Sequence, residues 1–146
     1  MTYSQDLWRK LPPLAIAGGA AFWLSNFAIS RTPIAAAYRA ALSISYNPML
    51  MESLVGGLII EMMVSYGLLH YYERIPLPTP VRKSVLLSLI ILIIATLLLQ
   101  VPASFLPETG QALPSLFVGT LFNAIRIPAL GWMIGYAYDK LYGGAR

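Results

Sequence analysis

Glu61 and Arg126 are the two residues of this sequence whose chemistry stands out, because each interrupts a long apolar stretch. A charged side chain near the centre of a bilayer costs roughly 2.5 to over 10 kcal/mol, so it usually faces a partner or a wet cavity. The topology predicted below places both at the same depth on helices that run in the same direction. Arginine and a carboxylate can pair through two parallel hydrogen bonds. The pattern predicts either a buried salt bridge between two helices or a polar site in mid-membrane.

Polar neighbours at helical spacing accompany both charges. Asn123 lies three residues before Arg126, and Thr120 lies three residues before Asn123, so all three share one side of a helix. Ser65 lies one helical turn after Glu61. Such side chains serve a solute site or ordinary interhelical hydrogen bonds equally well. The predicted substrate-binding or pore residues are Glu61, Arg126, Asn123, Thr120 and Ser65.

A second basic pair lies closer to the predicted outer surface. Arg31 and Arg39 follow the first apolar stretch, and Asn26 lies near the end of that stretch. The two arginines form either an external vestibule that attracts anions or anchors that reach lipid headgroups. These three residues, Arg31, Arg39 and Asn26, are the predicted external mouth of the site.

Composition places the chain outside the soluble classes. Hydrophobic residues make up 58% of the 146 residues and charged residues 11%, against about 25% charged residues in a typical soluble domain. There is no cysteine and one histidine, His70, so thiol chemistry is excluded and no metal site or cofactor is predicted. The basic residues flank apolar stretches, which topology explains better than nucleic-acid binding does. No catalytic residues are assigned, and non-enzymatic functions are favoured.

Four stretches have the length and hydrophobicity of membrane spans, which need about 20 residues. They form a single integral membrane domain that covers residues 1–146. In the first stretch, Pro12 and Pro13 are expected in the first helical turn. The third stretch carries few polar residues and is expected to face mainly lipid. The predicted spans are residues 11–30, 50–70, 85–106 and 115–138.

The segment between the first two spans predicts a further short helix. Thr32 is a suitable cap, Pro33 suits the first helical position, and Asn47-Pro48 is expected to end the helix. A helix of about 14 residues is too short to cross a membrane. It lies flat at the outer interface or dips in as a re-entrant element. The flat arrangement is favoured, since irregular backbone at depth needs protein or water around it.

Lysine and arginine counts predict the orientation, because positive loops stay in the cytoplasm. The loops on the side of the two termini contain seven such residues and the opposite loops two. Both termini are therefore expected in the cytoplasm, and the cytoplasmic (inner) membrane is the expected location. The seven residues are Arg9, Lys10, Arg74, Arg82, Lys83, Lys140 and Arg146.

The expected fold is therefore an all-α membrane protein: a four-helix bundle with a short external interfacial or re-entrant helix between the first and second spans. Three functional hypotheses follow. The first is transport or permeation of a small solute or ion through the polar mid-membrane site. The second is a non-catalytic accessory or assembly subunit of a larger membrane complex, with the Glu61–Arg126 pair as structural glue. The third is a lipid-modifying enzyme that uses Glu61.

The expected partners are the lipid bilayer and further protein chains, and no nucleic acid. One chain of this size can hardly enclose a wide pore, so a homo-oligomer or a larger membrane complex is predicted. Small residues such as Gly131 and Gly135 form a GxxxG pattern that lets helices approach closely, within one chain or between chains.

Overall fold

The protein is helical throughout the part of the chain described by the computed structural model, residues 3–105 and 112–143. No β-strand occurs in those ranges. Four helical segments are long and apolar enough to cross a membrane, which confirms the predicted all-α membrane fold. They are Asp6–Ser30, Tyr46–Arg74, Pro80–Ala103 and Leu113–Tyr142.

Helix α1 (Tyr3–Ser30) is longer than the predicted first span at its amino end. Pro12 and Pro13 lie inside the helix, so the prediction that they occupy its first turn is wrong. The turns before them are polar and are joined by a salt bridge of 2.7 Å between Lys10 and Asp6. This pair has the four-residue spacing that favours a helix.

Helix α2 (Pro33–Ala41) is the short helix predicted after the first span. Thr32 caps it as predicted, with its hydroxyl oxygen accepting from the backbone N–H of Ala35 at 3.2 Å. The helix has nine residues and ends well before Asn47-Pro48, so the predicted end is wrong. Ser43 adopts a left-handed backbone (φ 53°), which breaks the helical path earlier.

Helix α3 (Tyr46–Tyr71) continues into the short helical turn η1 (Tyr72–Arg74), and helix α4 (Pro80–Ala95) follows. Thr79 caps α4 by accepting from the N–H of Arg82 at 3.3 Å. Lys83, which was expected among the loop cations, is buried instead. Its ammonium donates to the carbonyl of Tyr72 and lies 3.9 Å from the centre of the Tyr72 ring. The amino end of α4 is therefore fixed to the end of α3.

The third span contains a turn of π-helix, η2 (Thr96–Gln100), before the short helix α5 (Val101–Phe105). The N–H of Val101 donates to the carbonyl of Thr96, five residues earlier. Pro102 gives a physical reason, because its ring clashes with the carbonyl four residues before it in a regular α-helix. The final residue of the predicted span 85–106 lies outside the described residues.

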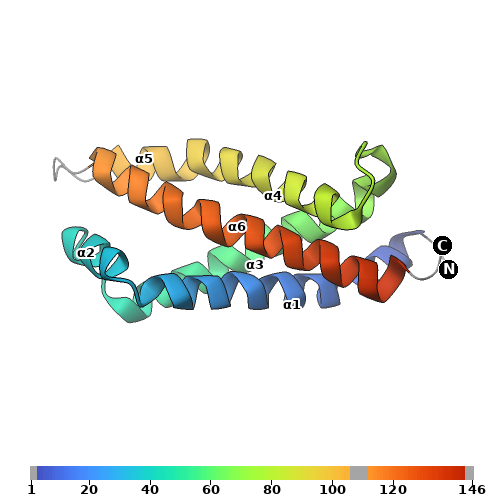
Figure 1. Ribbon diagram of the computed structural model, residues 1–146, viewed down its shortest axis with the longest axis horizontal. Coiled ribbons are helices and arrows are strands. Elements are labelled where there is room, and N and C mark those ends of the chain that lie inside the picture. Colours follow the sequence, from blue (N-terminus) through green and yellow to red (C-terminus); the bar gives the residue numbers. More distant parts are fainter. Residues whose placement is uncertain (1–2, 106–111, 144–146) are drawn as a thin grey trace.

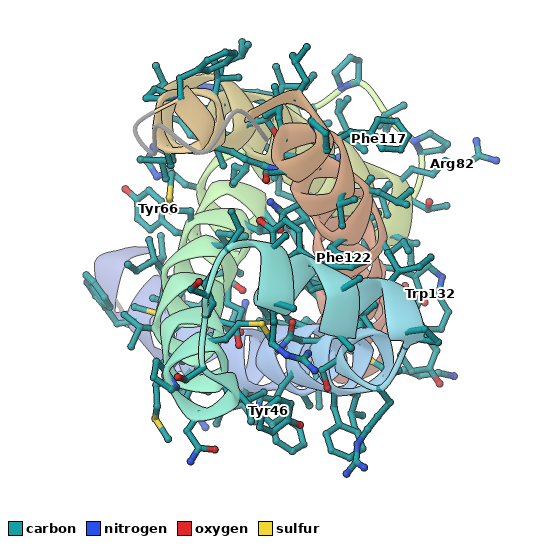
Figure 2. All side chains as sticks on the ribbon, turned by 90° about the vertical axis from the view of Figure 1, so that its left-hand side faces the viewer. Tyr46, Tyr66, Arg82, Phe117, Phe122 and Trp132 are labelled. Atoms are coloured by element: carbon teal, nitrogen blue, oxygen red, sulfur yellow. The ribbon has the colours of Figure 1, made fainter. Side chains whose placement is uncertain are left out.

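Helix α6 (Ala112–Tyr142) crosses the whole bundle and has Pro128 in its interior. Figure 1 shows the four long segments side by side, with the start of α1 and the end of α6 at one end and α2 at the other. These are called the terminal end and the α2 end below. Helix α2 runs crosswise to the long axis over the α2 end (Figures 1 and 2).

The four long helices are arranged as a square. Helix α1 packs against α3 and α6, and the third span packs against the same two helices, so α3 and α6 lie diagonally opposite. Figure 2 looks along the bundle from the α2 end and shows this arrangement. Large side chains on the outer surface, such as Phe117 and Trp132, point away from the bundle, as expected for groups in contact with lipid.

The apolar core fills the terminal half of the bundle. Leu14 from α1, Leu68 from α3 and Ile134 from α6 are fully buried there. Gly135 lies so close to α4 that an added Cβ would be 2.8 Å from the carbonyl oxygen of Pro80. The close helix packing in this half is therefore made within one chain.

Candidate functional site

Arg126 lies in the half of the bundle nearer α2, where it is held by two amide side chains. Its Nη1 donates to Oδ1 of Asn26 on α1, and its Nη2 donates to Oδ1 of Asn123, one turn earlier on α6. The guanidinium carbon lies 5.2 Å from the centre of the Phe22 ring. The Nε atom is buried without a hydrogen-bond partner. Arg126 thus keeps one donor unused while its two terminal nitrogens are fixed.

Both amides pass hydrogen bonds on to other helices. Asn26 donates to the hydroxyl of Ser53 on α3 at 2.9 Å. Asn123 donates to Oε1 of Gln100 in η2 at 2.9 Å. All four long helical segments are therefore connected through one set of polar side chains. This set, called the amide network below, consists of Ser53, Asn26, Arg126, Asn123 and Gln100.

The amide network is also anchored to the backbone at its two ends. Gln100 donates from Nε2 to the carbonyl of Leu116 on α6 at 3.1 Å. Ser53 donates to the carbonyl of Leu50, one turn earlier on α3, at 2.9 Å. Asparagine and glutamine can donate and accept at once. This property lets the network hold Arg126 with neutral groups.

Glu61 on α3 has a very different environment. Its side chain is 3% exposed, and its Oε2 atom has no hydrogen-bond partner. The carboxyl group lies against Gly19 of α1, where an added Cβ would be 2.5 Å from Oε2. One turn further along α3, the hydroxyl oxygen of the fully buried Ser65 also has no partner. Two unpartnered polar atoms thus face the interior one turn apart.

The predicted salt bridge between Glu61 and Arg126 is absent. Within residues 3–105 and 112–143, the salt bridge formed is Lys10–Asp6, which is partly exposed. The prediction fails because α3 and α6 are diagonal and α1 lies beside both. Phe22 of α1 contacts Arg126 on one side, and on the other it lies where a Cβ of Gly57 would come within 2.8 Å of the ring. Equal depth does not bring the two charges together.

The other predicted site residues divide between these two environments. Asn123 accepts a hydrogen bond from Arg126, whereas Ser65 lies one turn from Glu61 on α3 and its hydroxyl has no partner. Thr120 is half-buried on α6 and takes no part in the hydrogen bonds of the amide network described above. Asn26, predicted at the external mouth, lies instead inside the bundle, where it is 3% exposed and bound to Arg126.

Sequence reasoning missed four contributors. Gln100 was expected on a helix that faces mainly lipid. It lies instead in the π-helical turn η2 and belongs to the amide network. A lone amide two residues before a proline is the signal that marks it in the sequence. Ser53, Phe22 and Gly19 have no comparable signal, because their importance comes from the neighbouring helix.

Arg31 and Arg39, the two arginines of the predicted external mouth, both lie at the α2 end. Both line a hollow of about 420 Å³, called the α2-end hollow below. Ser30, at the inner side of this hollow, lies one turn beyond Asn26 on α1. The hollow therefore adjoins the amide network through α1. Its lining residues are Ser30, Arg31, Thr32, Pro33, Ala36, Arg39 and Tyr46.

A second hollow of about 270 Å³ lies at the terminal end. Acidic and basic side chains both line it, among them Asp6, Lys10 and His70. The His70 ring stacks on Tyr66, with centroids 5.4 Å apart. No group of three or more histidine, aspartate or glutamate side chains suited to a metal ion occurs among the described residues.

Comparisons with protein-family models, with curated proteins and with solved structures found no match to this chain. The fold and the hydrogen bonds described above therefore define the class of protein directly. The chain is a helical protein with four segments able to span a membrane, built around buried polar side chains.

Proposed function

We propose that the protein transports or conducts a small solute or ion through the polar interior of its bundle. The observation that carries this proposal is the buried carboxyl group of Glu61, whose Oε2 has no partner and lies against Gly19. A buried polar group without a partner costs about 1–3 kcal/mol, and more if it is charged. Such groups within membrane spans commonly mark the paths of solutes and ions.

The arrangement of α1 supports a path to this carboxyl group. Ser30, Asn26, Phe22 and Gly19 follow one another at intervals of three or four residues, so they share one face of the helix. They lead from the α2-end hollow, past Arg126, to Glu61. The Phe22 ring lies between Arg126 and Gly57 and separates the two charges. We assign it the role of a constriction.

The accessory-subunit hypothesis is the second candidate, and the amide network favours it. Hydrogen bonds that join four helices stabilise a fold whether or not a solute passes. Against this candidate, the Glu61–Arg126 glue is absent among the described residues. The close-packing glycines are also used within the chain: Gly131 faces Ser84 and Ser88, and Gly135 faces α4.

A lipid-modifying enzyme is the least favoured function, since Glu61 lies within the bundle and contacts Gly19 rather than a surface groove. Assembly into a homo-oligomer or a larger membrane complex is part of the transport proposal, as is insertion in the inner membrane with cytoplasmic termini. Light scattering on the purified protein measures the assembly, and protease accessibility in oriented vesicles measures the orientation.

The test of the transport proposal is a flux assay in vesicles with Glu61→Gln as the decisive variant. Purified protein is reconstituted, and fluxes of protons, potassium, sodium, nitrate, phosphate and acetate are followed with entrapped dyes and by light scattering. The matched control is Glu73→Gln, the same chemical change at an exposed position in η1.

The expected result is a flux of at least one solute that Glu61→Gln abolishes and Glu73→Gln preserves, with both variants monodisperse. Equal flux in the parent and in Glu61→Gln would remove Glu61 from the pathway. Absence of flux for every solute, in folded protein, would favour the accessory role.

A further inference from the structure

The α2-end hollow presents cationic donors from two separate elements. Arg31 belongs to the turn after α1, and Arg39 belongs to the last turn of α2. The seven lining residues include no acidic side chain. Among the side chains that the structure describes, which do not include that of Glu52, neither arginine forms a salt bridge. Two guanidinium groups thus share one hollow without an anionic partner from the described chain.

Two of the hydroxyl groups at the hollow, those of Ser30 and Thr32, direct their hydrogens to the backbone. Ser30 donates to the carbonyl of Phe27 at 2.7 Å, and Thr32 donates to the carbonyl of Ile29 at 2.7 Å. Their hydrogens are therefore committed within α1. The donors left at the hollow are the guanidinium N–H groups, which never accept a hydrogen bond, and the hydroxyl of Tyr46, which lies 3.4 Å from the Ser30 hydroxyl oxygen. A ligand that matches them must be an acceptor.

Each arginine is held in place by an aromatic ring. The guanidinium carbon of Arg31 lies 4.8 Å from the centre of the Phe27 ring, and that of Arg39 lies 5.2 Å from the centre of the Tyr46 ring. Arg39 also donates from Nη1 to the carbonyl of Ser30 at 3.2 Å. One nitrogen of Arg39 is thus used for position, and its remaining N–H groups are left for a ligand. Groups held in this way lose less entropy on binding.

We propose that the α2-end hollow is a binding site for an oxyanion, held by Arg31 and Arg39. Planar guanidinium groups match the paired oxygens of phosphate and carboxylate groups. The anion would also offset the repulsion between two like charges in one hollow. The amino end of α2 at Pro33 adds its partial positive charge. The volume of about 420 Å³ accommodates a hydrated phosphate or a phosphate-bearing headgroup.

A further cationic group, Arg126, lies deeper in the bundle than the α2-end hollow. Ser30 at the hollow is followed one turn deeper by Asn26, which binds Arg126. Arg126 is a third cation without a carboxylate partner and has an unpartnered Nε. The cationic donors therefore continue from the hollow to Arg126, whereas an ionised Glu61 carboxyl beyond Phe22 would repel an oxyanion. The binding site itself does not rest on the proposed transport function.

The first experiment is calorimetric titration of inorganic phosphate into the full chain in detergent, at constant ionic strength, with sodium chloride titrated as reference. The variants are Arg31→Gln and Arg39→Gln. The matched control is Arg74→Gln, which removes an arginine that also lies over a ring, that of Tyr71, at the terminal end. The side chain of Arg31, unlike that of Arg39, forms no hydrogen bond to the backbone among those described, so its variant keeps the test valid if Arg39→Gln fails to fold.

The second arm is native mass spectrometry of protein purified from vesicles of phosphatidylglycerol and phosphatidylcholine. It shows whether a phospholipid is retained and whether the same two substitutions release it. We expect phosphate binding that weakens about tenfold or more in each hollow variant and is unchanged in Arg74→Gln. Retained lipid that depends on the two arginines, without binding of free phosphate, supports the oxyanion site and identifies a lipid headgroup as its occupant.

Absence of both phosphate binding and arginine-dependent lipid overturns the oxyanion site. The flux assay separates this outcome from failure of the transport proposal. Cation flux without phosphate binding would leave transport standing and remove the oxyanion assignment. Phosphate binding without any flux would leave the site standing and remove transport.

Discussion

The surroundings of Arg126 and of Glu61 differ although both residues interrupt membrane spans. Arg126 donates to two amide oxygens, and the amide network distributes its hydrogen bonds over all four long helical segments. Glu61 lies against Gly19 with one oxygen unpartnered, next to a serine hydroxyl that is also unpartnered. The comparison shows that the hydrogen bonds of Arg126 join helices of the fold, whereas Glu61 is buried without such bonds.

The difference has a simple chemical origin. A guanidinium group needs acceptors, and Asn26 and Asn123 provide acceptors that are themselves held by further donors. A carboxyl group needs donors, and its neighbours on α1 and α3 are Gly19 and Gly57, which have no side chain to offer. Substitution of Arg126 is therefore expected to lower stability, and substitution of Glu61 is expected to change function with little effect on stability. The following predictions test that separation.

Arg126→Gln should have the largest effect on stability. It leaves the Oδ1 atoms of Asn26 and Asn123 without their donor, and loss of such charge-assisted bonds costs about 2–4 kcal/mol. Thermal unfolding in one detergent measures this as a clear decrease in Tm. Arg82→Gln, at an exposed position on α4, is the control and should unfold like the parent. Parental stability in Arg126→Gln would contradict the structural role of the amide network.

Gly57→Ala should be the next most harmful change, and Gly56→Ala is its matched control. The two substitutions change helix propensity equally, but an added Cβ at Gly57 meets the Phe22 ring at 2.8 Å, whereas at Gly56 nothing lies within 4 Å. Overpacking of this kind costs about 1–3 kcal/mol. Unfolding of both variants in parallel measures the difference directly. Equal stability would mean that Phe22 is free to move between the two charged environments.

Gln100→Leu should lower stability by about 1 kcal/mol, because it removes two interhelical hydrogen bonds of about 0.6 kcal/mol each. Thr96→Val in the same π-helical turn is the control, since the Thr96 hydroxyl is buried without a partner and its removal should be neutral or stabilising. Denaturant unfolding of both variants measures the two changes in the free energy of unfolding. A larger loss in Thr96→Val would show that η2 matters for its own geometry rather than for Gln100.

Glu61→Gln should change the free energy of unfolding by less than about 1 kcal/mol, because no hydrogen bond of the carboxyl group is lost. The measurement is the same thermal unfolding, with size-exclusion profiles to confirm monodispersity. A decrease as large as that in Arg126→Gln would make Glu61 structural and would remove the contrast between the two sites.

The double variant Glu61→Gln with Arg126→Gln should show the smallest effect of all, a coupling energy within about 0.5 kcal/mol of zero. The two side chains share no hydrogen bond, so their single effects should add. A double-mutant cycle of unfolding free energies measures the coupling. A double variant that is no less stable than Arg126→Gln and more stable than the sum would indicate an ion pair after all.

The sequence predicted four helices long and apolar enough to cross a membrane, because length and hydrophobicity are local properties. The predicted cap at Thr32 is confirmed for the same reason, since a cap needs only its own turn. The end of α2 was missed because it depends on the left-handed backbone of Ser43, a residue without a sequence signal for that conformation. The length of α1 was missed because the two prolines are accommodated inside it.

The candidate site was half predicted. Asn123 and Arg126 were grouped correctly because they lie on one helix, where spacing alone defines the shared side. Arg31 and Arg39 were grouped correctly because α2 is short and follows α1 directly. Gln100 joined the amide network from a helix expected to face lipid, since the π-helical turn changes which side of that helix the residue occupies.

By itself, the sequence determined that the chain is a bundle of four apolar helices with two charges at similar depth, because depth follows from counting residues along each helix. The tertiary structure decided which partners those charges have. Partner choice depends on the rotation of each helix and on its neighbours, and here α1 places Asn26 beside Arg126 and Gly19 beside Glu61. Two charges that match in depth are thus kept apart by the arrangement of helices around them.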